Sequence, residues 1–206
     1  MMGRNHARVY SELKAVDSLY LYDLNGKAAS DLAGAFGATA SPPTVEDLLR
    51  SVDAVSVCVP TPYHFSVAET VLDAGGVPVL IEKPICATAE ETRRLIAMIS
   101  DGLIVGVGHI ERFNPIVPEI KKIVRRPPLY IEMKRHNPAS SRVSGSSVVE
   151  DLMIHDVDIV RNVLLPDGPP INSPAVGTRT FAAPSSLSEE PRYTSRRAGS
   201  LQRRSG

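Results

Sequence analysis

Short apolar runs alternate with amphipathic stretches over the first 110 residues of the chain. Four of the runs are rich in Val and Ile, which is typical of strands buried on both faces of a parallel sheet. They are residues 19–23, 53–59, 77–82 and 103–109. The stretches between them have helical spacing, so the pattern predicts βαβ units and an α/β fold.

Start and stop signals place the helices between these strands. Two stretches, Thr44–Asp47 and Thr88–Glu91, resemble capping boxes, in which the Thr side chain accepts from a free amide and the acid reaches back. A helix that begins after Pro62 is expected to end at Gly75 and Gly76, because glycine adopts a left-handed cap without strain.

A second region follows the last of these strands. The pattern predicts a helix, a strand, a Ser-rich loop and a helix over residues 115–125, 129–135, 139–147 and 148–164. A lone strand leaves a row of unpaired backbone groups, so residues 114–166 are expected to be the stub of a larger α+β domain. Residues 167–206 are rich in Pro, Ser, Gly and Arg and are expected to form a disordered basic tail.

Composition and charge narrow the class of protein. Hydrophobic residues make up 43% of the 206 residues and charged residues 22%, as in globular proteins, and no apolar run is long enough to span a membrane. Cys58 and Cys86 form neither a disulfide scaffold nor a CxxC pair. The net charge is zero, although six Arg and two Glu follow residue 171. A basic tail this short is interpreted as solvated rather than as a site for nucleic acid or an acidic partner, so we expect a cytoplasmic protein that binds neither nucleic acid nor membranes.

A glycine and an acid are spaced as in dinucleotide-binding folds. Gly3 opens a stretch of helical character, and Asp23 ends the next strand, 20 residues later. In such folds this distance separates the phosphate-binding glycines from the carboxylate that binds the ribose hydroxyls. An Asp that serves as a turn residue is the alternative interpretation.

Polar residues also follow two later strands. The segment 59–64 (VPTPYH) follows one strand, and Lys83, between Glu82 and Pro84, follows the next. Ligands of parallel α/β sheets bind in the crevice at the carboxyl ends of the strands, so both segments are candidate binding sites. A solvated loop lysine is the alternative for Lys83.

The predicted helix over residues 148–164 carries three titratable side chains. Asp151, His155 and Asp158 stand at i, i+4 and i+7 and therefore share one face. This pattern suits an acid–base site. An exposed stripe of ion pairs and a metal site of His and carboxylates are the alternatives, and no metal is expected.

These segments resemble the Gfo/Idh/MocA family of NAD(P)-dependent sugar oxidoreductases over about residues 2–165. Residues 82–84 match the EKP motif of the family, and residues 151–158 match its Dx3HxxD helix. Residues 59–70 and 108–115 also resemble family segments. Within the family, the chain is most similar to the UDP-N-acetylglucosamine 3-dehydrogenase branch.

The resemblance implies a Rossmann-like dinucleotide-binding domain over residues 1–113 that binds NAD. It also implies hydride transfer from a secondary alcohol of a sugar or nucleotide sugar. His155 or Lys83 would accept the hydroxyl proton, and Asp151 would orient either of them. A full-length protein of this kind is expected to form a homo-oligomer.

The same resemblance implies which residues contact the cofactor: Gly3, Asp23, Thr61, Pro62, His64, Glu82, Lys83 and Arg112. Asp23 favours NAD over NADP, because a carboxylate repels a 2′-phosphate. Arg112 and Asn114 are implied to lie near the nicotinamide or a substrate phosphate.

Two departures from the family pattern weaken the expectation of activity. The chain starts at the last glycine of the GxGxxG fingerprint, so the first strand, central in a 3-2-1-4-5-6 sheet, is expected to be missing. Residues 171–206 do not resemble the antiparallel sheet of the family's second domain. The alternative function is therefore that of an inactive, truncated dinucleotide-binding protein of the same family, and the 206-residue chain as written is expected to lack dehydrogenase activity.

Overall fold

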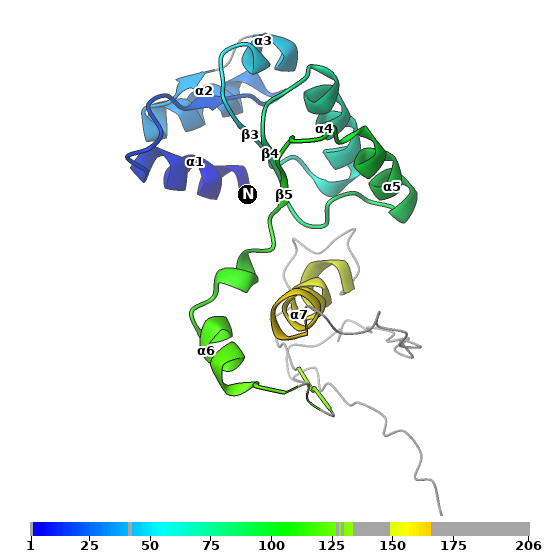
Figure 1. The fold of residues 1–206 in the computed structure, drawn as a ribbon. Coiled ribbons are helices and arrows are strands. Elements are labelled where there is room, and N and C mark those ends of the chain that lie inside the picture. The colour runs from blue at the N-terminus through cyan, green and yellow to red at the C-terminus, as the bar shows by residue number, and fades with distance from the viewer. Residues whose placement is uncertain (1, 41–42, 127, 129, 134–148, 166–206) are drawn as a thin grey trace, which may run out of the picture.

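The computed structural model describes residues 2–40, 43–126, 128, 130–133 and 149–165 (Figure 1). Helices and short strands alternate through the first 107 residues. The first elements are α1 (Met2–Glu12), β1 (Tyr20–Leu21), α2 (Gly26–Phe36), β2 (Thr39–Ala40) and α3 (Val45–Leu49). They are followed by β3 (Val55–Val57), the 3₁₀ turn η1 (Thr61–Tyr63), α4 (His64–Asp73), β4 (Val79–Ile81), α5 (Ala89–Met98) and β5 (Val105–Val107).

The elements in the remainder of the described chain are all helical. They are the 3₁₀ turn η2 (Ile110–Phe113), α6 (Ile116–Ile123), the π-helical η4 (Val149–Met153), α7 (Ile154–Asp158) and the π-helical η5 (Ile159–Leu164). The helices predicted at 115–125 and 148–164 are thus present over the described residues. The π-helical turns were not predicted, because the apolar pattern of a short helix does not distinguish the two kinds of turn.

The strands form two parallel sheets. β1 pairs with β2, and β3, β4 and β5 form a three-stranded sheet in that order. Each of the four predicted strands contains one observed strand, whereas β2 is too short to show a pattern in the sequence. No strand of the described chain joins β1 to β3. This break lies where a 3-2-1-4-5-6 sheet has its first strand.

The predicted helix boundaries are largely confirmed. At α5, the Thr88 side chain accepts from Glu91 N at 3.1 Å, and the Glu91 carboxylate accepts from Thr88 N at 3.0 Å. At α3, the Thr44 side chain accepts from Asp47 N, but its hydroxyl donates to the Asp47 carboxylate at 2.8 Å. That carboxylate bonds the hydroxyl instead of the cap amide, so the predicted reciprocal box is only half formed. α4 ends just before Gly75, where φ is +79°.

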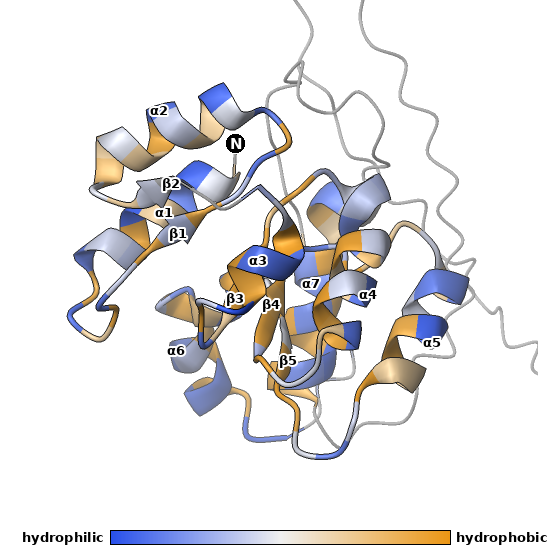
Figure 2. Ribbon diagram, turned by 90° about the horizontal axis from the view of Figure 1, so that it is seen from above, coloured by the Kyte–Doolittle hydropathy of each residue, from blue (hydrophilic) through white to orange (hydrophobic). Residues whose placement is uncertain are grey.

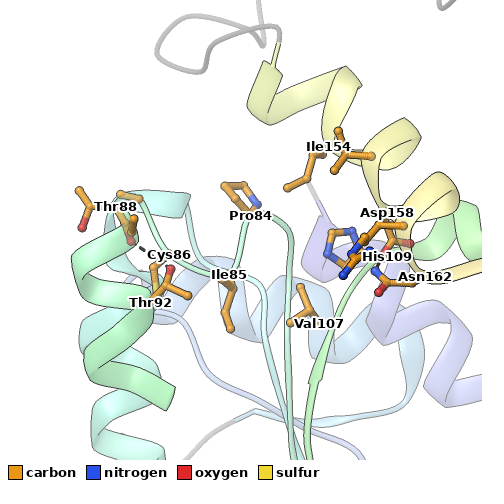
Figure 3. Close-up of a pocket in the computed structure, with 14 residues that line it drawn as sticks. Pro84, Ile85, Cys86, Thr88, Thr92, Val107, His109, Ile154, Asp158 and Asn162 are labelled. Carbon is orange, nitrogen blue, oxygen red and sulfur yellow. Dashed lines mark hydrogen bonds between the residues drawn. The ribbon is translucent and has the colours of Figure 1, made fainter. Parts of the chain in front are cut away.

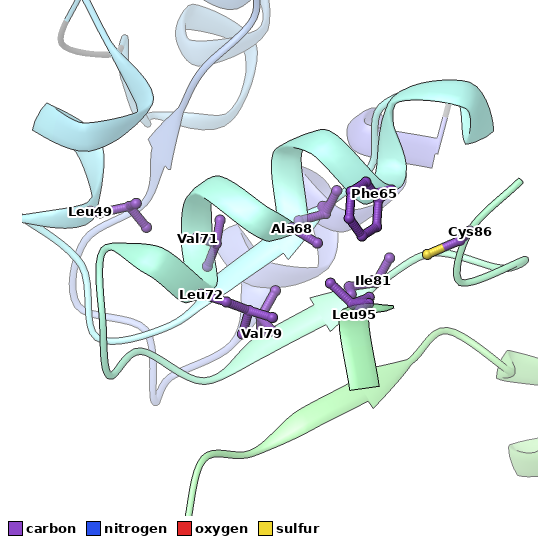
Figure 4. Packing of buried hydrophobic residues seen from close by; sticks show 10 residues of the cluster. Leu49, Phe65, Ala68, Val71, Leu72, Val79, Ile81, Cys86 and Leu95 are labelled. Carbon is purple, nitrogen blue, oxygen red and sulfur yellow. The ribbon is translucent and has the colours of Figure 1, made fainter. Parts of the chain in front are cut away.

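The apolar core is centred on the three-stranded sheet and the helices α4 and α5 (Figure 4). Ile81 of β4 and Leu95 of α5 are fully buried, and Ala68 and Val71 of α4 pack in the same cluster. Figure 2 shows β3 and β4 in the colours of apolar residues between helices with polar outer faces. The core therefore fixes the carboxyl ends of these strands, where polar residues follow.

The strand predicted at 129–135 is not present over its described residues 130–133. No described strand lies beside these residues to complete a ladder. The predicted loop at 139–147 and the tail at 167–206 lie outside the described residues. No helix among the described residues is long and apolar enough to cross a membrane.

Candidate functional site

The carboxyl ends of β3, β4 and β5 meet at one edge of the sheet. Val57, Ile81 and Val107 stand level with one another in parallel register. Beyond them, Glu82 N donates to Val57 O at 3.0 Å and Gly108 N donates to Ile81 O at 2.8 Å. The ladder therefore holds the residues that follow each strand at fixed positions.

Lys83 and Asp151 come together although 68 residues separate them. Lys83 Nζ donates to the backbone oxygen of Asp151 at 2.8 Å and to its carboxylate Oδ1 at 3.0 Å. The Lys83 side chain is 19% exposed. His155, one turn along the same helical segment, is buried. The predicted grouping of Lys83 with Asp151 is thus present, next to a buried imidazole.

Asp158 is an anchor rather than a third member of that group. Arg112 Nε donates to Asp158 Oδ2 at 3.0 Å, Arg112 also donates from Nη2 to Oδ1, and Asn162 Nδ2 donates to Oδ1 at 2.8 Å. Burial alone would raise the pKa of Asp158, but these hydrogen bonds outweigh it and hold the pKa below its usual range. Asp158 therefore stays ionised and ties the helix to η2. The predicted contact of Arg112 with a cofactor or phosphate is not tested by this geometry.

Glu82 is buried and paired with a residue of α1. His6 Nε2 donates to Glu82 Oε1 at 2.6 Å. A hydrogen bond with Cys58, followed by the bond to Glu82, raises the pKa of His6 to about 10. Burial would raise the pKa of Glu82, but the hydrogen bond and charge of His6 outweigh it and lower the pKa. The pair therefore fixes the start of α1 against the end of β4.

Gly108 allows the Glu82 carboxylate to lie against the backbone after β5. A Cβ at Gly108 would meet the carboxylate carbon and Oε1 of Glu82 at 3.1 Å, closer than Cβ atoms normally approach other atoms. Glycine at position 108 therefore leaves the space that the Glu82 carboxylate occupies.

His64 is buried between the loops that follow β3 and β4. Its ring is 1% exposed, with Nδ1 2.7 Å from Pro84 O and Nε2 2.8 Å from Val59 O. Each ring nitrogen is therefore within hydrogen-bond distance of a backbone carbonyl oxygen. The ring ties the loop after β3 to the loop after β4. The cofactor contact predicted for its side chain would require one of these bonds to be broken.

The remaining predicted cofactor residues lie near the ends of other elements. Gly3 is in the first turn of α1, where a Cβ would lie 3.7 Å from Cys58 Cβ, an ordinary contact. Asp23 is exposed after β1, and its Oδ1 accepts from Asn25 N at 2.8 Å, which is the turn geometry of the alternative interpretation. Thr61 and Pro62 form the turn η1 after β3.

Asn114 bonds the start of the helix that follows it. Its Oδ1 accepts from Ile116 N at 3.2 Å, at the first turn of α6. The predicted position near a nicotinamide or phosphate is not tested by this bond.

His109 was missed by the sequence analysis. It lies two residues after the end of β5, and burial, which is the main cause, lowers its pKa. Its ring nitrogen Nδ1 is buried, with no hydrogen-bond partner among the described residues. A signal was present in the sequence, because His109 ends the fourth predicted strand as Lys83 follows the third.

The polar residues at the strand ends fit a dinucleotide. A carboxylate follows β1, the Thr61 hydroxyl follows β3, and a lysine follows β4, all at carboxyl ends of parallel strands. In the part of the chain that the structure describes, no three His, Cys, Asp or Glu side chains converge as metal ligands.

A parallel α/β domain with such strand ends is a dinucleotide-binding domain. Residues 1–112 match the family model GFO_IDH_MocA, described as an oxidoreductase family with an NAD-binding Rossmann fold. The chain therefore belongs to the Gfo/Idh/MocA oxidoreductase family, as its EKP and Dx3HxxD segments predicted.

Relatives agree with this assignment. UDP-N-acetylglucosamine 3-dehydrogenase of Acidithiobacillus ferrooxidans is 37% identical over 177 residues, which cover 85% of this chain and 55% of the relative. Inositol 2-dehydrogenase of Rhizobium meliloti is 26% identical over 172 residues, covering 79% of this chain and 52% of the relative. A solved structure of the Acidithiobacillus enzyme matches with a TM-score of 0.71 at 36% identity and covers 79% of this chain and 53% of that one. The chain thus spans about half the length of these relatives.

Proposed function

We propose that this chain is the dinucleotide-binding part of an NAD-dependent dehydrogenase that oxidises a secondary alcohol of a sugar or nucleotide sugar. The observation that carries the proposal is the contact between Lys83 and Asp151 beside the buried His155, at the carboxyl end of β4. Each side chain belongs to a motif of the family, and the fold brings them together at the strand ends, where α/β sheets bind ligands.

The residues proposed to hold NAD surround the strand ends. Asp23 would accept from the adenosine ribose hydroxyls, and Gly3, at the start of α1, would let the backbone approach the pyrophosphate. Thr61 and Pro62, with the backbone at Glu82 and Lys83, would border the nicotinamide. The side chain of His64 would not contact NAD, because its ring nitrogens already lie against two backbone carbonyl oxygens. Bound NAD would accept the hydride.

Lys83 and His155 are proposed to divide the proton chemistry. Both contacts of Lys83 Nζ are to oxygen acceptors, so this residue is suited to donate a hydrogen bond to the substrate oxygen. His155 is then suited to accept the hydroxyl proton, because an imidazole titrates near neutral pH. Asp151 positions Lys83 through its carboxylate and its backbone oxygen.

UDP-N-acetylglucosamine is the substrate we propose to test first, since the relative from Acidithiobacillus that carries this name is 37% identical. A cytoplasmic location and a homo-oligomer are also proposed for the full-length protein. The competing function is binding of the dinucleotide without turnover, and it is favoured by the unpaired edges of β1 and β3 among the described strands.

The experiment is a titration of NADH and NADPH fluorescence with the 206-residue chain, followed by an assay of NAD reduction with UDP-N-acetylglucosamine. Tighter binding of NADH than of NADPH, relaxed by Asp23→Ser, is expected. If turnover is seen, Lys83→Ala and His155→Ala should each lower kcat by roughly 10²–10⁴. Binding without turnover would favour the competing function, and absence of binding would contradict both.

A further inference from the structure

A cavity of about 370 Å³ lies beside the strand ends (Figure 3). One wall is the loop from Pro84 to Thr88, and the opposite wall is the helical segment with Ile154 and Asp158. Val107 and His109, at the end of β5, lie between these walls. Most of the lining surface is apolar, so the few polar side chains that reach it decide what can bind there. They are Thr88, Thr92, His109, Asp158, Arg161 and Asn162.

The two ring nitrogens of His109 differ in their surroundings. Nδ1 is buried and has no partner among the described residues. A proton on Nδ1 would create a buried N–H without an acceptor, which costs more than a lone pair without a donor. The proton therefore belongs on Nε2, and Nε2 is the nitrogen left to meet a ligand in the cavity.

The charged groups around His109 agree with a neutral ring. Burial lowers its pKa, and the positive charges of Arg112 and Lys83 act in the same direction. The carboxylates of Asp158 and Glu82 act against them, but both are already paired, with Arg112 and His6. A neutral imidazole with its proton on Nε2 is an uncharged hydrogen-bond donor.

We propose that His109 is a substrate-binding residue whose Nε2–H donates to a hydroxyl oxygen of the substrate in this cavity. The proposal deepens the function proposed above and rests on it for the identity of the reaction. An uncharged donor beside apolar walls suits a sugar ring, whose C–H face packs on the walls while a hydroxyl oxygen accepts.

The test uses two substitutions that imitate different ring nitrogens. The side-chain amide of His109→Gln reaches the position of Nε2, whereas that of His109→Asn reaches only the position of Nδ1. Ile110→Ala, at the exposed neighbouring residue, is the control. Dissociation constants of UDP-N-acetylglucosamine and of NADH are measured separately for each 206-residue variant, and the tautomer of His109 is read from ¹⁵N NMR of the wild type.

The expected result is an Nε2–H tautomer and a sugar-nucleotide affinity that falls roughly tenfold in His109→Asn, about the value of one hydrogen bond. His109→Gln should recover most of this loss. NADH affinity should be unchanged in all variants, as should both affinities in Ile110→Ala. The thermal melt of each variant checks that it is still folded.

Several results would overturn the proposal: a proton on Nδ1, equal sugar affinity in wild type and His109→Asn, no sugar binding by the wild type, or a loss confined to NADH. Reduction of NAD is measured separately from sugar binding. Loss of sugar affinity in His109→Asn together with a wild type that binds but never reduces NAD would favour dinucleotide binding without turnover and leave the role of His109 intact.

Discussion

The two sheets differ in what they bury. The three-stranded half (β3, β4 and β5 with α4 and α5) buries large side chains such as Phe65, Ile81 and Leu95. In the two-stranded half (β1 and β2 with α1 and α2), the buried apolar residues among those described are Ala7, Ala29 and Ala33. Since the free energy of burial scales with apolar area, the three-stranded half carries most of the stability that holds the candidate site.

Side-chain hydrogen bonds join the two halves. His6 of α1 bonds Glu82 at 2.6 Å, and the Tyr10 hydroxyl bonds the Ser56 hydroxyl at 2.5 Å. Such bonds are directional and depend on charge, whereas apolar packing does not. The orientation of α1, and with it Gly3, is therefore expected to respond to pH and to single polar substitutions.

The largest effect is expected from shortening a core side chain of the three-stranded half. Leu95→Ala leaves a cavity in the core and should lower the free energy of unfolding by about 2–5 kcal/mol. Ala33→Gly, the matched change in the two-stranded half, should cost about 1 kcal/mol, as for a helix interior. Urea denaturation followed by circular dichroism measures both. Equal losses would contradict the difference between the halves.

A smaller loss is expected from a methyl group at Gly108. Gly108→Ala brings a Cβ to 3.1 Å from the Glu82 carboxylate, which cannot shift without disturbing its bond to His6. The expected cost is on the order of 1–3 kcal/mol. Gly34→Ala in α2, where a Cβ meets no atom within 4 Å, should instead stabilise by roughly 0.5–1 kcal/mol. Thermal melts compare the two variants. If both substitutions raise the melting temperature, Gly108 is not closely packed against Glu82.

The attachment of α1 should depend on pH through His6. Its pKa is raised from 6.5 to about 10 in the folded chain, so the stabilising contribution is complete below pH 6.5 and is lost as pH rises toward 10. His6→Gln should therefore destabilise the chain more at pH 6 than at pH 10. Denaturation of both proteins at several pH values tests this, and a difference independent of pH would show that His6 is not charged in the folded state.

The smallest effect is expected at a surface ion pair of the two-stranded half. Lys27 and Asp31 of α2 lie 2.7 Å apart, but their side chains are 81% and 67% exposed. Lys27→Ala should change the free energy of unfolding by no more than about 0.5 kcal/mol, because water and salt screen such pairs. A larger change in the same urea assay would mean that the two-stranded half depends on its surface charges.

Much of the fold follows from local patterns in the chain. Apolar runs marked the strands, because a strand buried on both faces has to be apolar throughout. The capping box at Thr88 and the end of α4 before Gly75 were also predictable, since both depend on bonds and backbone angles within a few residues. The grouping of Lys83 with Asp151 was predicted from motifs, and their contact agrees with it.

Tertiary structure decided how the remaining polar residues are used. His64 and Asp158 stand in segments that resemble a binding site, yet one bonds two backbone carbonyl groups and the other bonds Arg112. His109 gained its importance from Glu82 and Lys83, which follow β4, and from Asp158 on the helix at 149–164. Apart from Val59, these partners lie 20 to 49 residues away in the chain, and local spacing carries no information about such distant contacts. Burial then determines which side chains must find a partner, and burial exists only once the chain has folded.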